Sequence, residues 1–251
     1  MGCGGSCFSH RHTVPKNKGP LNKKAVDITH FKFLQLIGKG GFADVYAARR
    51  HSDKQIVAIK CMPKTSFIYR SSSTNEWKAK SVLFVERNIM TRCSSPFLLP
   101  LLHAFQDTKY VYLVLPLQIG GDMGHYIRTI SLFDEKQVQF YGAELILALE
   151  TLHQNKILFR DLKPSNILFT SRGHVQISDF GLAAVLKAEN NYYTSGDVGT
   201  VGYQAPEIVA KDPYSFSVDY FSLGVSLYRM ATGRRPYGSR GKTALIAVIT
   251  S

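Results

Sequence analysis

The sequence predicts an α+β fold with two lobes, a small β-rich lobe followed by a larger, mainly helical one. Short runs rich in β-branched and aromatic residues, separated by glycine-rich and polar turns, follow one another from Phe31 onward. In the second half of the chain, apolar residues instead recur every three or four positions, which is the spacing of one helix face. We expect the connection between the lobes at residues 116–121.

Composition indicates an ordinary globular protein. Hydrophobic residues make up 45% and charged residues 20% of the 251 positions, so the chain can bury a core. No apolar run reaches the length of about 18 residues that a membrane span needs. The four cysteines are too sparse for a disulfide framework, which favours reduced thiols inside the cell. The net charge of +13 predicts an anionic partner, but the lysines and arginines are spread along the chain, so we expect no specific nucleic-acid site.

The chain divides into a tail and one folded unit. Residues 1–30 are rich in Gly, Ser, Lys and His and lack periodic hydrophobicity, which predicts a flexible tail. The folded unit spans 31–251, with the small lobe at 31–115 and the large lobe at 122–251.

Three strand-like runs open the small lobe and predict an antiparallel meander: FKFLQLIG, DVYAARR and QIVAIKCM. A helical pattern follows, carried by Trp77, Val82, Val85, Ile89 and Met90. Two more strand-like runs complete this lobe, LPLLHAFQD and KYVYLVLPL.

Two helices are expected to dominate the large lobe. The first begins near Asp134, a residue type that caps helix N-termini. Its apolar face comprises Val138, Tyr141, Leu145, Ala148 and Leu152. The second helix lies within SVDYFSLGVSLYRMATG and ends at Gly233.

The turn between the first two expected strands is rich in glycine. It reads Gly38-Lys39-Gly40-Gly41-Phe42-Ala43-Asp44-Val45, the pattern G-x-G-x-x-A-x-V. A turn without bulky side chains lets backbone N–H groups approach the phosphates of a nucleotide. Because no helix follows directly, a Rossmann-type dinucleotide site is not expected. Such a turn can also be a plain hairpin, so it predicts a nucleotide site only together with other motifs.

Lys60 ends the expected strand Val57-Ala58-Ile59-Lys60, from which its ammonium group can reach α and β phosphates. Ala58 is placed to pack on an adenine ring. Glu86, on the following helix, can pair with Lys60 and fix its position. Taken singly, a strand-end lysine and a Lys–Glu pair are commonplace on protein surfaces.

Three ordered motifs occupy the second half of the chain: FRDLKPSN at 159–166, DFG at 179–181 and APE at 205–207. Asp161 can accept the proton of a substrate hydroxyl, and Lys163 can neutralise a migrating phosphoryl group. Asp179 and Asn166 offer the hard oxygen ligands that Mg²⁺ prefers. An isolated aspartate is usually a turn residue, but the ordered series predicts phosphoryl transfer from Mg-ATP.

From Phe31 to its end the sequence resembles the eukaryotic protein kinases, through the ordered motifs GKGGFADV, VAIK, Glu86, FRDLKPSN, DFG and APE. Lys163 and Thr200 are typical of the serine/threonine kinases. ERNIM and GGDM are similar to the AGC-like group, and in style the chain is closest to the G-protein-coupled-receptor kinases and the YANK-type kinases. The resemblance implies the bilobal protein kinase fold.

The resemblance also implies roles for individual residues. Catalytic roles would fall to Asp161, Lys163, Lys60 and Glu86, and magnesium would be held by Asn166 and Asp179. Within the ATP site, Leu115 would be the gatekeeper, Pro116 to Gln118 the adenine-binding hinge and Asp122 a ribose contact. Asp219 would support the catalytic loop from below. The implied ATP site comprises Ile37, Gly38, Lys39, Gly40, Gly41, Phe42, Ala43, Val45, Ala58, Lys60, Leu115, Pro116, Gln118, Asp122, Asn166 and Asp179.

Two positions near the catalytic centre depart from the family pattern. Phe159 stands where the family usually has histidine, and an aromatic ring can maintain the packing there. Gly196 stands where relatives carry a phosphorylated threonine, so phosphorylation at this position is excluded. Thr194 and Ser195 are substitute phosphorylation sites in the same segment. The expectation we favour is activation by something other than loop phosphorylation.

Two further departures concern the peptide substrate. Ser165 and Arg229 replace glutamates that attract basic peptides in relatives. Loss of these carboxylates in a chain of charge +13 favours acidic phosphorylation sites.

Measured against the family, the chain stops early. Ser251 falls within a helix of the large lobe, so we expect an incomplete large lobe. Glu207, which pairs with an arginine from the missing part in relatives, would then be unpaired or solvated.

The N-terminus carries a lipidation signal. Residues 1–6 read MGCGGS and fit M-G-x-x-x-[ST], so Gly2 is the expected myristoylation acceptor. Cys3 and Cys7 are candidates for palmitoylation, and basic residues follow at Arg11, Lys16, Lys18, Lys23 and Lys24. One myristoyl chain attaches only marginally, so a second chain or a basic patch is needed. The alternatives are a plain disordered tail and a zinc site at Cys3, Cys7, His10 and His12.

These features together predict a serine/threonine kinase that uses ATP and Mg²⁺. We expect it to be anchored at the cytoplasmic face of a membrane, in the first place the plasma membrane. The alternative location is the cytoplasm. The alternative is a membrane-bound pseudokinase or scaffold, or a fragment of a longer kinase, that keeps the nucleotide pocket without turnover. The incomplete large lobe favours this alternative.

Overall fold

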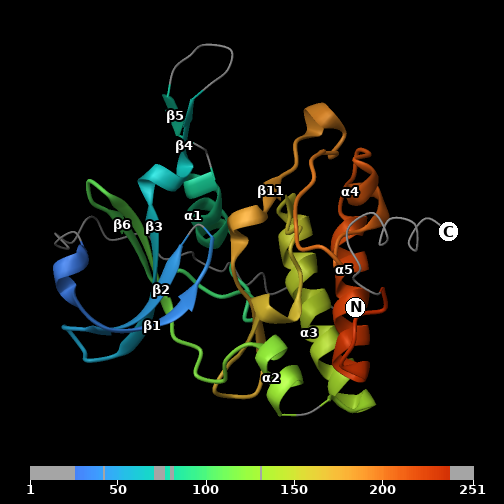
Figure 1. Cartoon of the computed structure of the whole chain (residues 1–251), viewed down its shortest axis with the longest axis horizontal. Helices are drawn as coiled ribbons and strands as arrows, with labels where there is room; N and C mark the ends of the chain where they lie inside the picture. Colours follow the sequence, from blue (N-terminus) through green and yellow to red (C-terminus); the bar gives the residue numbers. More distant parts are fainter. Residues whose placement is uncertain (1–25, 42, 71–76, 80–81, 131, 238–251) are drawn as a thin grey trace, which may run out of the picture.

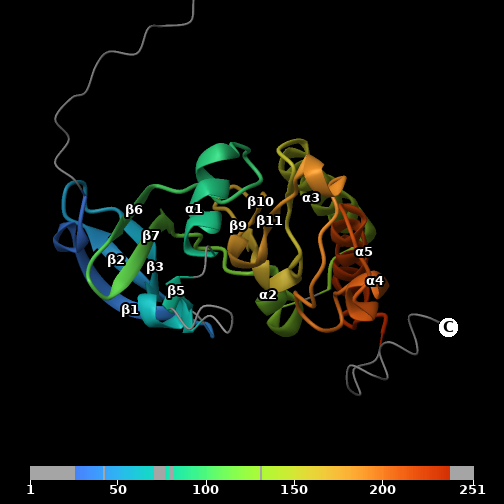
Figure 2. The ribbon, with the colours of Figure 1, turned by 90° about the horizontal axis from the view of Figure 1, so that it is seen from above.

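The structure is a computed structural model that describes residues 26–41, 43–70, 77–79, 82–130 and 132–237. Its elements form two lobes that lie side by side, one built on a β-sheet and the other mainly helical (Figure 1). The same division is visible from above (Figure 2). The predicted α+β fold with two lobes is therefore confirmed.

A five-stranded antiparallel sheet forms the small lobe, with the strand order β1-β2-β3-β7-β6. The strands are β1 (Phe31–Lys39), β2 (Asp44–Arg50), β3 (Ile56–Pro63), β6 (His103–Gln106) and β7 (Tyr110–Pro116). The first three form the predicted meander, because neighbouring runs are joined by turns short enough to pair them directly. Side chains alternate between the two faces of a sheet, so each strand contributes side chains to both faces.

One prediction for the small lobe is wrong. Trp77 does not belong to a helix: it lies in β5 (Trp77–Ala79), which pairs with β4 (Ile68–Arg70) in a two-stranded ribbon that projects from the lobe (Figure 1). Helix α1 begins only at Val82 and ends at Arg92. A three-residue strand is too short to show the alternation that separates a strand from a helix, and its partner strand lay outside the helical window.

Four α-helices build the described part of the large lobe: α2 (Met123–Thr129), α3 (Glu135–Gln154), α4 (Pro206–Ala210) and α5 (Ser217–Thr232). Asp134 caps α3 as predicted, because its carboxylate accepts from the Gln137 backbone N–H while the Gln137 side chain accepts from the Asp134 backbone. Gly233 ends α5 at φ 74°, a left-handed conformation that glycine adopts without strain.

Two short β-pairs fix the segments between α3 and α4. Strand β8 (Ile157–Leu158) pairs with β11 (Ala184–Val185), and β9 (Ile167–Phe169) pairs with β10 (Val175–Ile177). The loops that begin after β8 and after β10 are thereby held beside each other above the core face of α3.

The main hydrophobic core joins both lobes. It includes the fully buried side chains of Leu145, Leu149 and Leu152 on α3 together with Leu113 on β7. Cys93 also lies in this core, and burial raises the pKa of its thiol.

No helix in the described part of the chain is long and apolar enough to cross a membrane.

Candidate active site

A cavity of about 740 Å³ lies between the lobes. Its upper wall is the face of the sheet formed by Val45, Lys60 and Met62, and its lower wall carries Asp161 and Asp179. The glycine-rich turn between β1 and β2 covers it. Residues from both halves of the sequence therefore meet around one space that is large enough for a nucleotide.

The glycine-rich turn is tight. The Gly40 N–H donates to the Ala43 carbonyl at 2.9 Å, which closes the turn between β1 and β2. A Cβ at Gly40 would lie 3.2 Å from that same oxygen, so the turn has little room for a side chain. Of the predicted turn residues, those that line the cavity are Gly38, Lys39, Gly40, Gly41, Ala43 and Val45. Phe42 lies outside the described residues.

Lys60, Glu86 and Asp179 form one charged cluster. The Lys60 Nζ lies 2.7 Å and 2.9 Å from the two Glu86 carboxylate oxygens and 2.8 Å from Asp179 Oδ1. These partners are 26 and 119 positions away in the sequence. The predicted Lys60–Glu86 contact is thus formed, and Asp179 is added to it.

Electrostatics keep both ends of this cluster charged. Burial by itself would lower the pKa of the Lys60 ammonium, but the negative charges of Glu86 and Asp179 outweigh burial and raise it. Burial would likewise raise the pKa of the Asp179 carboxyl, but the charge of Lys60 and its hydrogen bond hold this pKa below the ordinary value. The cluster therefore presents a fixed cation and a fixed anion to the cavity at neutral pH.

The Asp161 carboxylate is the centre of a second cluster. Oδ1 accepts from the Thr200 hydroxyl at 2.6 Å, and Oδ2 accepts from Lys163 Nζ at 2.8 Å and Asn166 Nδ2 at 3.0 Å. Lys163 also donates to Thr200 Oγ1 at 2.7 Å. A buried carboxylate with three donors has one fixed orientation, which is what a proton acceptor in catalysis requires.

Two side-chain oxygen atoms at this site, one on Asn166 and one on Asp179, are left for a cation. Asn166 uses its amide nitrogen for Asp161, and no hydrogen bond within the described part of the chain occupies its Oδ1. Asp179 directs Oδ1 to Lys60 and the Gly181 N–H, which leaves Oδ2 without a described partner. The segments of the two residues are joined, because the Ser178 N–H donates to the Asn166 carbonyl at 2.9 Å. A free carboxylate oxygen and a free amide oxygen suit Mg²⁺, which binds few protein ligands and keeps substrate phosphates and water as the others.

Asp219 supports the backbone of the loop that carries Asp161. Its side chain is fully buried, and its two oxygens accept from the backbone N–H groups of Phe159 and Arg160, both at 2.8 Å. His153 on α3 contacts the same carboxylate at 2.8 Å through Nε2. Arg160 adopts φ 70°, a left-handed conformation that is unusual for a residue with a side chain and needs such support.

The Arg160 side chain connects the loop to the segment that follows the DFG motif. Its Nε donates to the Leu182 carbonyl at 2.7 Å, and Nη1 donates to the Tyr214 hydroxyl at 3.3 Å. The Tyr214 hydroxyl in turn donates to the Gly196 carbonyl at 3.0 Å. Backbone hydrogen bonds of 2.9 Å in both directions join Thr194 to Tyr214. Tyr214, which is 1% exposed, therefore fixes this segment through both its hydroxyl and its backbone.

The remaining predicted ATP-site residues lie on β1, on the paired strands β3 and β7, and in the segments that follow β7 and β8. Ala58 and Leu115 pair across β3 and β7 and are both buried. Asp122 lines the cavity and also caps α2 by accepting from the His125 N–H at 2.8 Å. The residues that do not line the cavity wall itself are Ile37, Ala58, Leu115, Pro116, Gln118 and Asn166.

Several residues of the site were missed by the sequence reasoning. Met62 and Leu182 line the cavity, His153 contacts Asp219, and Tyr214 binds Arg160. Met62 had a detectable signal, because it lies two positions after Lys60 on the same strand and must share its face. His153 and Tyr214 had none, since their partners are 66 and 54 positions distant.

Some predictions fall on residues outside the described ranges. These are the lipidation candidates Gly2, Cys3 and Cys7, and the zinc alternative that adds His10 and His12. Among the described residues, no group of three or more His, Cys, Asp or Glu is arranged to hold a metal ion by itself. Glu207 has a described partner, because its carboxylate accepts from the Ser217 hydroxyl at 3.3 Å.

Comparison with known proteins agrees with this geometry. Residues 31–250 match the family described as "Protein kinase domain". The chain is 40% identical over 222 residues to G protein-coupled receptor kinase 1 of Caenorhabditis elegans, covering 88% of this chain and 33% of that protein. It is 38% identical over 225 residues to the serine/threonine-protein kinase Sgk1 of Danio rerio, covering 89% of this chain and 50% of that protein.

A third relative is the serine/threonine-protein kinase gad8 of Schizosaccharomyces pombe, which is 36% identical over 218 residues, covering 87% of this chain and 37% of that protein. The chain spans between a third and a half of the length of these three relatives.

Proposed function

This chain belongs to the protein kinase family, and we propose that it is a serine/threonine kinase of the AGC type that transfers the γ-phosphate of ATP to hydroxyl groups of proteins. The convergence of the Lys60 and Asp161 clusters on one interlobe cavity is the observation that supports this activity most directly. Two of the relatives bear serine/threonine-protein kinase in their names.

Each charged residue has a distinct task in the proposed reaction. Asp161 accepts the proton of the substrate hydroxyl as its oxygen attacks the γ-phosphorus, while the bond from that phosphorus to the bridging oxygen of ADP breaks. Lys163 lies 2.8 Å from Asp161 and places a positive charge beside the phosphoryl group. Lys60, fixed by Glu86, binds the α and β phosphates. Asn166 and Asp179 would hold magnesium, which would neutralise phosphate charge.

The test of this proposal is transfer of labelled phosphate from Mg-ATP to casein by the purified chain. Transfer that is lost in the Asp161→Asn variant supports a working kinase. A folded protein that binds ATP and gives no transfer supports the alternative, a pseudokinase or scaffold.

An acidic substrate site is the second part of the proposal. Arg229 donates to the Tyr203 hydroxyl at 2.5 Å, and Arg235 donates to the Val201 carbonyl at 2.9 Å. Two guanidinium groups therefore flank residues 201–203, directly after Thr200, which contacts the catalytic Asp161. Ser165 in the catalytic loop adds no negative charge. An acidic peptide is attracted to such a surface, and a basic one is repelled.

We expect Arg229→Glu to lower kcat/KM for a casein-like acidic peptide by about 10-fold, or about 1.4 kcal/mol, and to raise it for an arginine-rich peptide. The measurement is the ratio of kcat/KM for the two peptides in wild type and variant. Arg172→Glu changes the same charge at an exposed turn of the large lobe and should leave the ratio unchanged. A wild-type preference for arginine-rich peptides would contradict the proposed site.

Activation without loop phosphorylation is the third part. The Arg160–Tyr214–Gly196 contacts already fix the segment that a phosphate orders in relatives. Tyr214→Phe removes the hydroxyl that links Arg160 to Gly196. We expect it to lower kcat about 10-fold and the free energy of unfolding by about 1–3 kcal/mol, because two hydrogen bonds of a buried group are lost.

Tyr193→Phe is the matched control for Tyr214→Phe, because Tyr193 lies in the same segment with a side chain that is 51% exposed. Its kcat should equal that of the wild type. Wild-type enzyme treated with a phosphatase should also keep its activity. Full inactivation by the phosphatase would show that a phosphate, and not Tyr214, orders the segment.

Membrane attachment through the N-terminus is the last part, and it rests on the sequence. Gly2→Ala removes the myristoylation acceptor, so we expect the variant to move from the membrane pellet to the supernatant after fractionation of cells. Gly4→Ala keeps the acceptor and should remain in the pellet. A Gly2→Ala variant that still pellets with membranes would argue against acylation as the anchor.

A further inference from the structure

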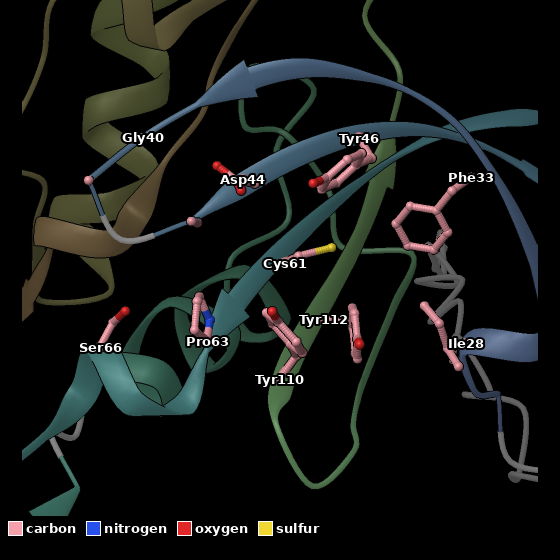
Figure 3. A pocket seen from close by; sticks show the side chains of 12 residues that line it. Ile28, Phe33, Gly40, Asp44, Tyr46, Cys61, Pro63, Ser66, Tyr110 and Tyr112 are labelled. Atoms are coloured by element: carbon pink, nitrogen blue, oxygen red, sulfur yellow. The ribbon is translucent and has the colours of Figure 1, made fainter.

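A second cavity, of about 500 Å³, lies on the opposite face of the small-lobe sheet. Its wall carries Tyr46 from β2, Cys61 from β3, and Tyr110 and Tyr112 from β7 (Figure 3). Their neighbours Val45 and Lys60 line the interlobe cavity, because successive side chains of a strand point to opposite faces. The sheet therefore separates two cavities.

The chemistry of this second cavity suits a cation. Asp44, at one end, is half-buried, and its carboxylate has no hydrogen-bond or ion-pair partner among the described residues. The hydroxyls of Tyr46 and Tyr110 have none either, whereas that of Tyr112 donates to Asp107 at 2.7 Å. Aromatic faces attract cations, and a free carboxylate forms charge-assisted hydrogen bonds with them.

Two carboxylates, those of Asp44 and Asp107, lie close enough to act on the cysteine of this cavity. Burial raises the pKa of the Cys61 thiol, and the charges of Asp44 and Asp107 add to this effect, which brings the pKa to about 12. Cys61 therefore remains a neutral thiol and contributes no negative charge of its own. Asp44 and Asp107 thus place negative charge beside this cavity, in a chain whose net charge is +13.

The two cavities share a wall. Gly40, Gly41 and Ala43 of the glycine-rich turn border both of them, as does Ser66. A group bound on the reverse face therefore contacts the turn that covers the interlobe cavity. Occupancy of one cavity is expected to restrict the position of that turn over the other.

The chain itself contains lysines whose distance along the sequence allows them to reach this cavity. Ile28 lines the second cavity, and the 25 residues that open the chain contain five lysines and arginines and no aspartate or glutamate. Lysines at 16, 18, 23 and 24 precede Ile28 by four to twelve residues, a reach of up to roughly 13–43 Å when extended. We propose that the cavity between Asp44 and Tyr110 binds the side chain of a lysine from residues 16–24 of the same chain and thereby holds the glycine-rich turn from its outer side.

The test is lysine acetylation footprinting of the full-length protein, with reaction rates read by mass spectrometry. In the wild type, one of the four lysines should react at least about fivefold more slowly than exposed Lys211, because its ammonium is paired with a carboxylate. Asp44→Asn should abolish this protection, and so should Tyr110→Ala. Asp53→Asn, a matched loss of charge in the same lobe outside the cavity, should preserve it.

Three results would overturn the proposal. They are equal reaction rates for all four lysines in the wild type, protection that survives in Asp44→Asn, and protection that appears only at high protein concentration, which indicates a second copy. Asp44 has no partner among the described residues to lose, so Asp44→Asn should remain folded, and a change in lysine protection then reports on binding.

A kinetic measurement tests the link to the glycine-rich turn and rests on the proposed kinase activity. Asp44→Asn and the double variant Lys23→Gln/Lys24→Gln should shift KM for ATP in the same direction if one of these two lysines is the protected one. The variant that combines these changes should shift KM for ATP no further, since each change removes the same contact. Additive shifts in KM for ATP would contradict the link to the glycine-rich turn. If the enzyme is inactive, the kinase proposal fails while the footprinting result still decides whether the cavity binds a lysine. Failure of the two proposals is therefore distinguishable.

Discussion

Asp161→Asn is expected to lower kcat for phosphate transfer by about 10³-fold, with KM for ATP nearly unchanged. The asparagine is nearly the same size, but it cannot take up the proton of the substrate hydroxyl, and proton transfer of this kind contributes about 10²–10⁴-fold. The hydrogen bonds from Lys163 and Thr200 to the carboxylate, at 2.8 Å and 2.6 Å, also lose their charge-assisted character. The measurement is steady-state transfer to casein together with nucleotide binding to the isolated variant.

The matched control for this variant is Asp212→Asn, which removes one charge from an exposed position of the large lobe. Its kcat should equal that of the wild type. If Asp161→Asn kept more than about a tenth of the wild-type kcat, Asp161 would not be the proton acceptor in the reaction. Loss of nucleotide binding in Asp161→Asn would instead indicate that the cavity had collapsed. Collapse is not expected, because asparagine and aspartate have nearly the same size.

Asp219→Ala is expected to lower the free energy of unfolding by about 3–5 kcal/mol. The substitution leaves the buried N–H groups of Phe159 and Arg160 without acceptors, and each unsatisfied donor costs about 1–3 kcal/mol. His153 loses its partner as well. Since a domain has a total stability of only about 5–15 kcal/mol, this loss is severe. Thermal unfolding should show a Tm about 10 °C or more below that of the wild type.

The left-handed conformation of Arg160 gives Asp219→Ala a second expected effect. Without the Asp219 carboxylate, nothing in the described part of the chain binds the N–H of Arg160, whose φ of 70° is itself unfavourable. The loop that carries Asp161 should relax, and kcat should fall even at temperatures where the variant is folded. Asp212→Ala serves as the control for both readouts. A Tm within 2–3 °C of the wild type would show that water or another acceptor replaces Asp219.

Sequence patterns alone predicted both lobes, because the signals that define them are local. The meander of β1, β2 and β3 follows from short β-rich runs joined by tight turns. The start of α3 at Asp134 and the end of α5 at Gly233 follow from caps that act within one helical turn. Trp77 was misplaced for the same reason, since a strand of three residues has no local pattern and depends on its partner.

The motifs also predicted which residues have chemistry to offer, because carboxylate, amide and ammonium groups at fixed spacing indicate phosphoryl transfer. Only the tertiary structure decided how these groups contact one another. The contact of Lys60 with Asp179 joins positions 119 residues apart, and that of Asp219 with Phe159 joins positions 60 apart.

Tyr214 and the cavity beside Asp44 had no signal in the sequence. Tyr214 is one of 13 tyrosines, and its importance arises only where packing places its hydroxyl between Arg160 and Gly196. Asp44 was read as one residue of the glycine-rich turn, yet the pleat of β2 turns its side chain away from the interlobe cavity. Local sequence determines elements and residue chemistry, whereas contacts between distant segments, and the burial that strengthens them, exist only once the chain has folded.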